Sequence, residues 1–250
     1  GVTGAPADPR RAAWLVLRDV DGGAHADRAA RRRFRELDGR DRALATRLAY
    51  GAVRLRARLD HELAHFVDRA LDRVEPEVLD WLRLGLHQLR ELRVPDHAAV
   101  DECVRGAGAT VGDRVTGFVN GVLRAAARHR DRRELFPDPD ADLLEHLATW
   151  GSHPRWLLRR WLDRWPPEEV RRLVEHDNRP PDVTVRFLEG DAAAARDRLG
   201  ADGSALEPLA DWPRSAVLAE GAPGELLERL EGAVVQDPAA SAVVDYVGDI

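Results

Sequence analysis

Two histidines one helical turn apart form the first pattern that could carry chemistry. The segment "HELAH", residues 61–65, has a glutamate between them, as in zinc hydrolases whose histidines bind the metal and whose glutamate acts as general base. At about 100° per residue, Leu59, Leu63 and Phe66 share one helix face, and His61 and His65 point away from it. The sequence therefore favours a solvent-facing helix surface and predicts no metal site, with a zinc hydrolase as an alternative.

Cys103 is the only cysteine and therefore the only thiol that could act as a nucleophile. Val100, Val104 and Ala107 lie with it on one helical stripe, and a cysteine in an apolar stripe behaves as a small hydrophobic residue. A single cysteine also excludes an internal disulfide. We predict that Cys103 packs in the core and is not a catalytic nucleophile.

Several glycines interrupt the helical patterns. The segment "GAGATVG", residues 106–112, resembles a phosphate-binding loop only loosely, because it follows a helix where the nucleotide motif requires a strand. We interpret it as a flexible connector between helices. Gly51, Gly85 and Gly121 lie inside predicted helices, where glycine costs about 1 kcal/mol relative to alanine, so they indicate close helix packing.

A run of arginines near the start of the chain could bind a polyanion. Residues 1–60 hold 14 arginines against 8 acidic residues, although the net charge of the whole chain is −6. In "RAARRRFRELDGRDR", residues 28–42, several arginines follow helical spacing and could hold phosphates together. A merely solvated face is the alternative. The candidate RNA-binding residues are Arg10, Arg11, Arg28, Arg31, Arg32 and Arg35.

Four tryptophans lie within sixteen residues, among arginines. They are Trp150, Trp156, Trp161 and Trp165. Exposed aromatic rings beside arginines can stack nucleic-acid bases, but at helical spacing aromatic residues are more often part of a core. We predict core packing for this group.

The elements that position these residues fall into two modules. Residues 9–129 show helical periodicity throughout, and about seven short helices with tight connections predict a compact all-α domain. Charged residues and two prolines without periodicity predict a linker at residues 131–142. Further helices follow, and then "PPDVTVRFL", "SAVLA" and "AVVQ" read as strands that alternate with helical segments, which predicts a small α+β module.

Composition places the chain among soluble proteins. It has 250 residues, 44% of them apolar, which is enough to form real cores. No apolar run approaches the length of a membrane span, and no leader sequence opens the chain, so we expect a cytoplasmic protein without a membrane partner.

The order of segments resembles a known family. "LAYGAVR", "LRLGLHQLRELRVPDHAAVDE" and "GFVNGVLR" resemble the NusB-like domain at the front of bacterial small-subunit rRNA 5-methylcytosine methyltransferases of the Sun/Fmu/RsmB type. "SHPRWLLRRW" and "DNRPPDVTVR" resemble their linking domain, which free-standing NusB antitermination factors lack. "GAVVQDPAAS" resembles the segment that leads into their catalytic domain, with Gln236, Asp237 and Ser241 at the motif positions. One departure is Phe187-Leu188, where the family usually has Val-Asn after "VTVR".

The resemblance implies a domain plan. It gives an all-α NusB-like RNA-binding domain at residues 8–130, the linker at 131–142, a small α+β linking domain at 143–235, and the start of a Rossmann-like methyltransferase domain at 236–250. We expect this chain to end at the threshold of that last domain.

The resemblance also implies a chemistry. Such enzymes bind S-adenosylmethionine, attack carbon 6 of a cytosine with a cysteine thiolate and methylate carbon 5, on a base that must first be unstacked. We expect the cofactor loop and the catalytic cysteines beyond Ile250, so that this chain alone is inactive and acts as the RNA-binding and positioning region. The expected partners are small-subunit rRNA and ribosomal or transcription proteins, and we expect a monomer. A non-enzymatic NusB-like adaptor for RNA or protein is the alternative function.

Overall fold

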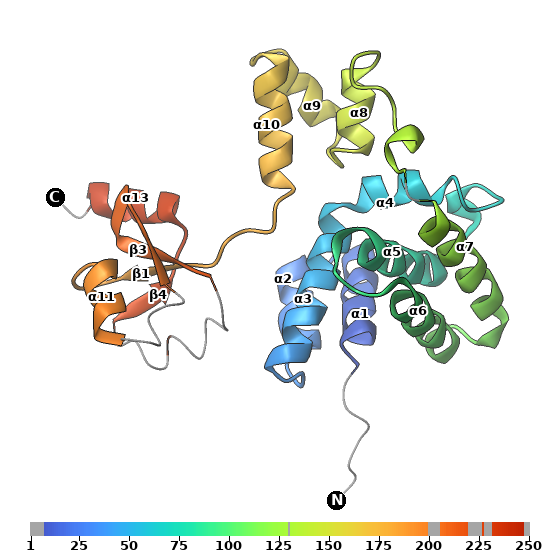
Figure 1. Ribbon diagram of the computed structural model, residues 1–250, viewed down its shortest axis with the longest axis horizontal. Coiled ribbons are helices and arrows are strands. Elements are labelled where there is room, and N and C mark those ends of the chain that lie inside the picture. The colour runs from blue at the N-terminus through green and yellow to red at the C-terminus, as the bar shows by residue number, and fades with distance from the viewer. Residues whose placement is uncertain (1–7, 130, 200–205, 220–226, 228–231, 248–250) are drawn as a thin grey trace, which may run out of the picture. The chain divides into compact units, whose positions relative to one another are not determined.

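The computed structural model describes residues 8–129, 131–199, 206–219, 227 and 232–247, and the account below concerns those residues (Figure 1). The chain divides into two compact units, Gly1–Arg179 and Pro180–Ile250. No helix among the described residues is long and apolar enough to cross a membrane.

The first unit is all-helical, which confirms the all-α NusB-like part of the expected fold class. Its first seven α-helices are α1 (Pro9–Asp21), α2 (Ala26–Arg33), α3 (Gly39–Arg54), α4 (Arg56–Leu63), α5 (Pro76–Glu91), α6 (Asp96–Thr110) and α7 (Thr116–Arg128). Short 3-10 turns lie at η1 (Leu71–Arg73), η2 (Asp113–Val115) and η3 (Arg133–Leu135). The remaining helices are α8 (Leu143–Thr149), α9 (Arg155–Leu162) and α10 (Pro167–Asp177).

Helix α5 forms the centre of the first core. Pro76 occupies its first turn, where the missing N–H needs no partner, and nearly all its side chains from Val78 onward are buried. Trp81 is fully buried, and its ring stacks on Trp14 of α1 with 5.9 Å between centroids. Helices α1, α3, α6 and α7 all pack against α5.

Two glycines allow the close helix contacts around α5. A Cβ at Gly85 would lie 2.5 Å from Leu123 Cδ1, and a Cβ at Gly51 would lie 2.1 Å from His87 Nε2, so the predicted close packing is confirmed at both positions. At Gly121 the prediction is wrong, because that residue is exposed and faces open space. The interpretation of "GAGATVG" as a flexible connector is also wrong: α6 runs to Thr110, and Gly106 packs against the Trp81 ring.

A second helical layer follows α7. Helices α8, α9 and α10 share a small core of their own, and α8 packs on α4 (Figure 1). The expected linker contains η3, and Phe136 is buried there between His61 and Trp150, with ring centroids 4.9 and 5.0 Å away. The expected linking domain, residues 143–235, is thus divided between the two units, and the domain boundaries remain a prediction.

The second unit is a four-stranded antiparallel sheet with helices. Its elements are β1 (Thr184–Phe187), α11 (Ala192–Leu199), β2 (Leu206–Leu209), β3 (Trp212–Leu218), β4 (Ala233–Val235) and α13 (Pro238–Val247). The strand order is β2-β3-β1-β4, so β1 lies inside the sheet with all four of its residues buried. This arrangement confirms the small α+β module. One of the helical segments expected between the strands, "GELLERLEG" at residues 224–232, lies almost entirely outside the described residues.

Strand β2 was not expected from the sequence, and it contains Pro208. Proline cannot donate to a strand ladder and is tolerated in edge strands or at bulges. Both conditions hold: β2 is the edge strand beside β3, and the register shifts between Pro208 and Leu209.

Candidate nucleic-acid interface

Helix α2 presents its arginines to solvent because its apolar face is narrow. Ala29 and Ala30 are buried against the core, whereas Arg28, Arg31 and Arg32 are exposed. The three consecutive arginines at positions 31 to 33 lie in the last turn, where the helix dipole favours positive charge. Three of the candidate RNA-binding arginines are therefore exposed on this helix, and their contact with RNA remains a prediction.

Arg31 and Arg35 line one hollow between α2 and α3. The hollow has a volume of 410 Å³, and its other walls include Phe34, Arg42 and Tyr50. The Arg31 side chain forms no ion pair with any described residue, and the Arg35 side chain lies 3.9 Å from Glu36 in an exposed pair. An open apolar floor between arginines can accept a sugar or base while the guanidinium groups bind phosphate oxygens.

Two polar residues keep the wall of the hollow in place. The guanidinium of Arg42 donates to the backbone carbonyls of Phe34 and Leu37 at 3.3 and 2.9 Å, which fixes the turn between α2 and α3. The Tyr50 hydroxyl donates to Asp27 Oδ1 at 2.6 Å, and burial raises the pKa of Tyr50 to about 12. The tyrosine therefore remains a protonated donor at neutral pH.

Arg32 and Arg33 are engaged by a carboxylate of α1. Asp19 accepts hydrogen bonds from Arg32 Nη2 at 2.7 Å and from Arg33 at 2.8 and 2.9 Å. The Arg33 hydrogen bond, followed by that of Arg32, lowers the pKa of Asp19 to about 2. Arg32 thus helps to hold α2 on α1 through one hydrogen bond. Arg33, which was not among the candidate residues, holds α2 more firmly through two.

The two candidates on α1 differ from each other. Arg10 Nε donates to Gln88 Oε1 at 2.9 Å, and Gln88 Nε2 in turn donates to Cys103 Sγ at 3.2 Å. Arg10 is therefore part of the internal packing of the helices, while Arg11 is exposed. Of the six candidates, the structure brings only Arg31 and Arg35 to the hollow.

The "HELAH" residues serve to pack α4. Glu62 is fully buried and accepts hydrogen bonds from Arg90 Nε at 2.6 Å and Arg132 Nε at 3.2 Å. His61 Nε2 donates to the Leu135 carbonyl at 2.8 Å, so the expectation that His61 faces solvent is wrong, whereas His65 is exposed. Among the described residues no group of three or more side chains could hold a metal ion.

Cys103 lies in the core of the first unit, as its helical stripe predicts. Its exposed fraction is 0%, and burial raises the pKa of the thiol to about 12. The thiol is therefore protonated at neutral pH and cannot act as a nucleophile.

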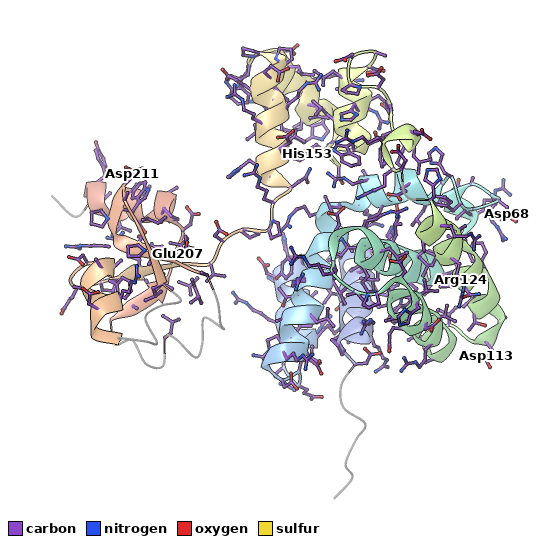
Figure 2. The ribbon with its side chains drawn as sticks, viewed as in Figure 1. Asp68, Asp113, Arg124, His153, Glu207 and Asp211 are labelled. Atoms are coloured by element: carbon purple, nitrogen blue, oxygen red, sulfur yellow. The ribbon has the colours of Figure 1, made fainter. Side chains whose placement is uncertain are left out.

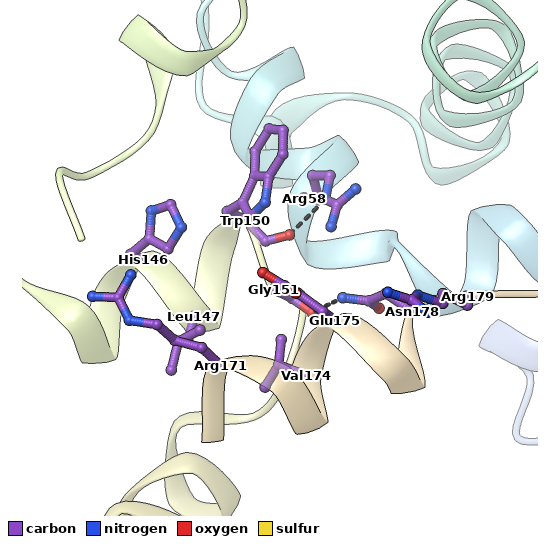
Figure 3. Close-up of a pocket in the computed structure, with 10 residues that line it drawn as sticks. All are labelled: Arg58, His146, Leu147, Trp150, Gly151, Arg171, Val174, Glu175, Asn178 and Arg179. Carbon is purple, nitrogen blue, oxygen red and sulfur yellow. Dashed lines mark hydrogen bonds between the residues drawn. The ribbon is translucent and has the colours of Figure 1, made fainter. Parts of the chain in front are cut away.

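A polar cavity of 380 Å³ lies where α4, α8 and α10 meet (Figure 3). Arg58 Nε donates to the Trp150 carbonyl at 2.5 Å, and its guanidinium lies 4.5 Å from the centroid of the Trp150 ring. Asn178 Nδ2 donates to the Gly151 carbonyl at 2.7 Å. These contacts tie the three helices together. The sequence did not reveal the cavity, because its walls come from three separate segments.

Hydrogen bonds of the expected entry motif connect β1 with the start of α13. The motif residues are Gln236, Asp237 and Ser241. The Gln236 N–H donates to the Thr184 carbonyl at 3.0 Å, which extends the pairing of β4 with β1. Asp237 Oδ1 accepts from the Ala239 N–H at 2.8 Å at the start of α13, and the Ser241 hydroxyl donates to the Asp237 carbonyl at 3.2 Å. In the second unit these residues have a structural role.

The tryptophan-rich segment departs from its expected core packing. Trp150 and Trp161 are half-buried, and the Trp161 ring contacts His153, labelled in Figure 2, at 5.6 Å between centroids. Trp156 and Trp165, by contrast, are 65% and 43% exposed. For these two residues the prediction of core packing is wrong.

Comparison with known families defines the class of the two modules. Residues 7–128 match the NusB family, and residues 153–224 match the ferredoxin-like domain of RsmF/B-like methyltransferases. The order β1, α11, β2, β3, β4 with β1 and β3 central agrees with a ferredoxin-like sheet.

Curated proteins from two bacteria are similar to most of this chain. A Mycobacterium tuberculosis protein named as a methyltransferase is 35% identical over 248 residues, 95% of this chain and 54% of that protein. Ribosomal RNA small subunit methyltransferase B of Escherichia coli is 31% identical over 219 residues, 85% of this chain and 48% of that protein. The chain therefore combines a NusB domain with the ferredoxin-like domain of RsmF/B-like methyltransferases, and over most of its length it is similar to proteins named ribosomal RNA small subunit methyltransferase B.

The chain spans about half the length of the curated relatives it matches. A solved structure, the crystal structure of PH0851, superposes with a TM-score of 0.64 at 16% identity, over 98% of this chain and 56% of that one. At this identity the likeness concerns the fold alone.

Proposed function

We propose that this chain binds and positions small-subunit rRNA for an S-adenosylmethionine-dependent cytosine-5 methyltransferase. The observation that carries the proposal is the pair Arg31 and Arg35 on one hollow, in a chain whose relatives are named as rRNA methyltransferases. The finer parts of the proposal are a cytoplasmic location, a monomeric state and additional contacts with ribosomal or transcription proteins.

The arginines would act on the RNA backbone. Arg28, Arg31 and Arg35 form no strong ion pair with described residues, so their guanidinium groups can bind phosphates without breaking an internal contact. The floor at Phe34 and the Tyr50 hydroxyl can receive a sugar or base edge. This chemistry selects RNA by shape and charge, and it leaves the choice of cytosine to other parts of the enzyme.

The methyl transfer itself would need residues other than those described. S-adenosylmethionine supplies the methyl group in this family, and a cysteine thiolate attacks the base. Cys103 cannot be that thiolate, because it is buried and its pKa is raised to about 12. We therefore propose that residues 1–250 alone transfer no methyl group.

The proposal is tested by RNA affinity. Replacement of Arg31 and Arg35 by glutamine should weaken binding to small-subunit rRNA transcripts about tenfold or more, because two charge-assisted contacts are lost. The matched control is Arg73→Gln with Arg93→Gln, since both arginines are exposed and form no side-chain contact with described residues. Equal affinities of the two double variants would contradict the proposal.

A further inference from the structure

We propose that the solvent side of α9 is a second RNA contact, at which an unstacked base lies on the indole of Trp156 while Arg159 and Arg160 bind the neighbouring phosphates. This inference rests on the proposed RNA-binding function, but it is carried by a different helix from the α2 arginines. The expected ligand is single-stranded RNA, because a base within a duplex has no free face to offer.

The position of Trp156 on the helix is the first observation. Leu158 is fully buried, and Trp161 and Leu162 are partly buried against the same core. At about 100° per residue, Trp156 lies about 160° from Leu158, almost opposite the buried face. Its exposed fraction of 65% agrees with this geometry. A large apolar ring at the solvent apex of an amphipathic helix contributes little to the core.

The charges beside the indole are the second observation. Arg159 and Arg160 follow Trp156 by three and four residues, so both are its neighbours on the helix surface. Both are exposed, and neither side chain forms an ion pair or hydrogen bond with a described residue of the first unit. Arg155 differs, because its Nε donates to Glu145 at 2.8 Å. The two free guanidinium groups therefore flank the ring.

The segment directly after α9 is also exposed. Arg164 is exposed without a side-chain partner in the described part of the first unit, and Trp165 is 43% exposed. Pro166 and Pro167 then begin α10 and restrict the backbone beside the second indole.

Packing beneath α9 makes the surface rigid. Leu158 is buried among the side chains of α8 and α10, and Trp161 contacts His153 at 5.6 Å between ring centroids. A platform whose orientation is fixed before binding loses little conformational entropy when a base stacks on it. Stacking also tolerates any base, so this contact would add affinity with little sequence preference.

A protein partner is the other class of occupant for such a face. Residues 180–250 carry 14 acidic residues and 5 arginines, so an acidic segment is available within the chain itself. The combination of one exposed ring with two adjacent free guanidinium groups favours RNA, because it matches one base and its two phosphates. Shielding of Trp156 in the free chain would indicate the protein partner.

The test uses the full chain and a single-stranded RNA oligonucleotide. Trp156→Ala should reduce affinity about 5- to 150-fold, the usual effect of removing one stacking ring, and Trp156→Phe should restore part of it. Affinity for a duplex of the same length should change little. Arg159→Gln with Arg160→Gln should reduce the slope of log K against log salt by about 1.4. Tyr246→Ala is the control, because this ring is 84% exposed on α13.

Two results would overturn the inference. The first is an unchanged affinity of Trp156→Ala for single-stranded RNA. The second is acrylamide quenching in which Trp156, identified by the difference between the native chain and Trp156→Phe, is shielded without RNA. If Arg31→Gln with Arg35→Gln weakens binding and Trp156→Ala does not, only this inference fails. If the native chain binds no RNA, the proposed function fails as well.

Discussion

The guanidinium of Arg186 on β1 donates a hydrogen bond to the backbone carbonyl of Ser241 in α13, over 2.8 Å. Both residues are buried. The arginine that ends "VTVR" and the serine of the Gln236, Asp237 and Ser241 motif therefore meet inside the second unit. The polar motif that leads into the expected catalytic domain is therefore attached to the sheet through a buried charge-assisted contact.

Arg186→Met should loosen α13 from the sheet. The variant leaves the Ser241 carbonyl without this donor, and such a loss costs about 1–3 kcal/mol. Hydrogen exchange of the amides in β1 and α13 should accelerate about 5- to 150-fold. Arg214→Met on β3 is the control, because Arg214 is exposed. Equal exchange rates in both variants would show that the contact does not hold α13.

Cys103 should be inert to alkylation in the folded chain. Burial raises the pKa of the thiol to about 12, and only the thiolate reacts. Iodoacetamide at pH 8 should therefore modify the native chain only at the rate at which the first unit unfolds, whereas the chain in urea should react within minutes. Rapid modification without denaturant would mean that the thiol is accessible.

The helices of the first unit could be predicted well from the sequence, because long amphipathic patterns determine which face is buried. The end of α4 could not. The helical periodicity of residues 9–129 continues past this point, but α4 ends at Leu63. There, backbone hydrogen bonds that span only three residues, from the His65 N–H to the Glu62 carbonyl and from the Phe66 N–H to the Leu63 carbonyl, tighten the chain into turns. Local pattern does not reveal such an ending, because Val67 is still buried beyond it.

The candidate site was predictable in part. Periodicity identifies the basic face of α2, but it cannot show that Asp19 engages Arg32 or that Arg10 bonds to Gln88, since these partners lie 13 and 78 residues away. Periodicity is equally uninformative about Glu62. A helical wheel places this residue near two histidines, whereas in the fold it accepts hydrogen bonds from Arg90 and Arg132. Long-range pairing decides which arginines remain free.

Glu62→Gln should destabilise the first unit. The substitution removes the negative charge between two arginines at a fully buried position, and breaking a buried ion pair typically costs about 3–5 kcal/mol. The measurement is urea unfolding followed by tryptophan fluorescence. Glu134→Gln is the control, because Glu134 is exposed and forms no side-chain contact with described residues. A loss no larger than that of the control would contradict this role.

His87 should make the first unit sensitive to acid. Burial lowers the pKa of His87 from 6.5 to about 4, so the folded state binds fewer protons than the unfolded state between these values. Stability from this group is present above pH 6.5 and is lost as the pH falls toward 4, by about 2.5 kcal/mol at pH 4.5. His87→Leu should reduce the difference in unfolding free energy between pH 7.5 and 4.5 by that amount. His97→Gln, an exposed control, should leave it unchanged.

The salt dependence of RNA binding tests the central claim most directly. Each phosphate contact with single-stranded RNA contributes about −0.7 to the slope of log K against log salt, so Arg28, Arg31 and Arg35 together should contribute about −2. Arg31→Gln with Arg35→Gln should make the slope less steep by about 1.4, while Arg73→Gln with Arg93→Gln should leave it as in the native chain. A native affinity that does not depend on salt, or equal slopes for the native chain and the Arg31 and Arg35 double variant, would contradict the account.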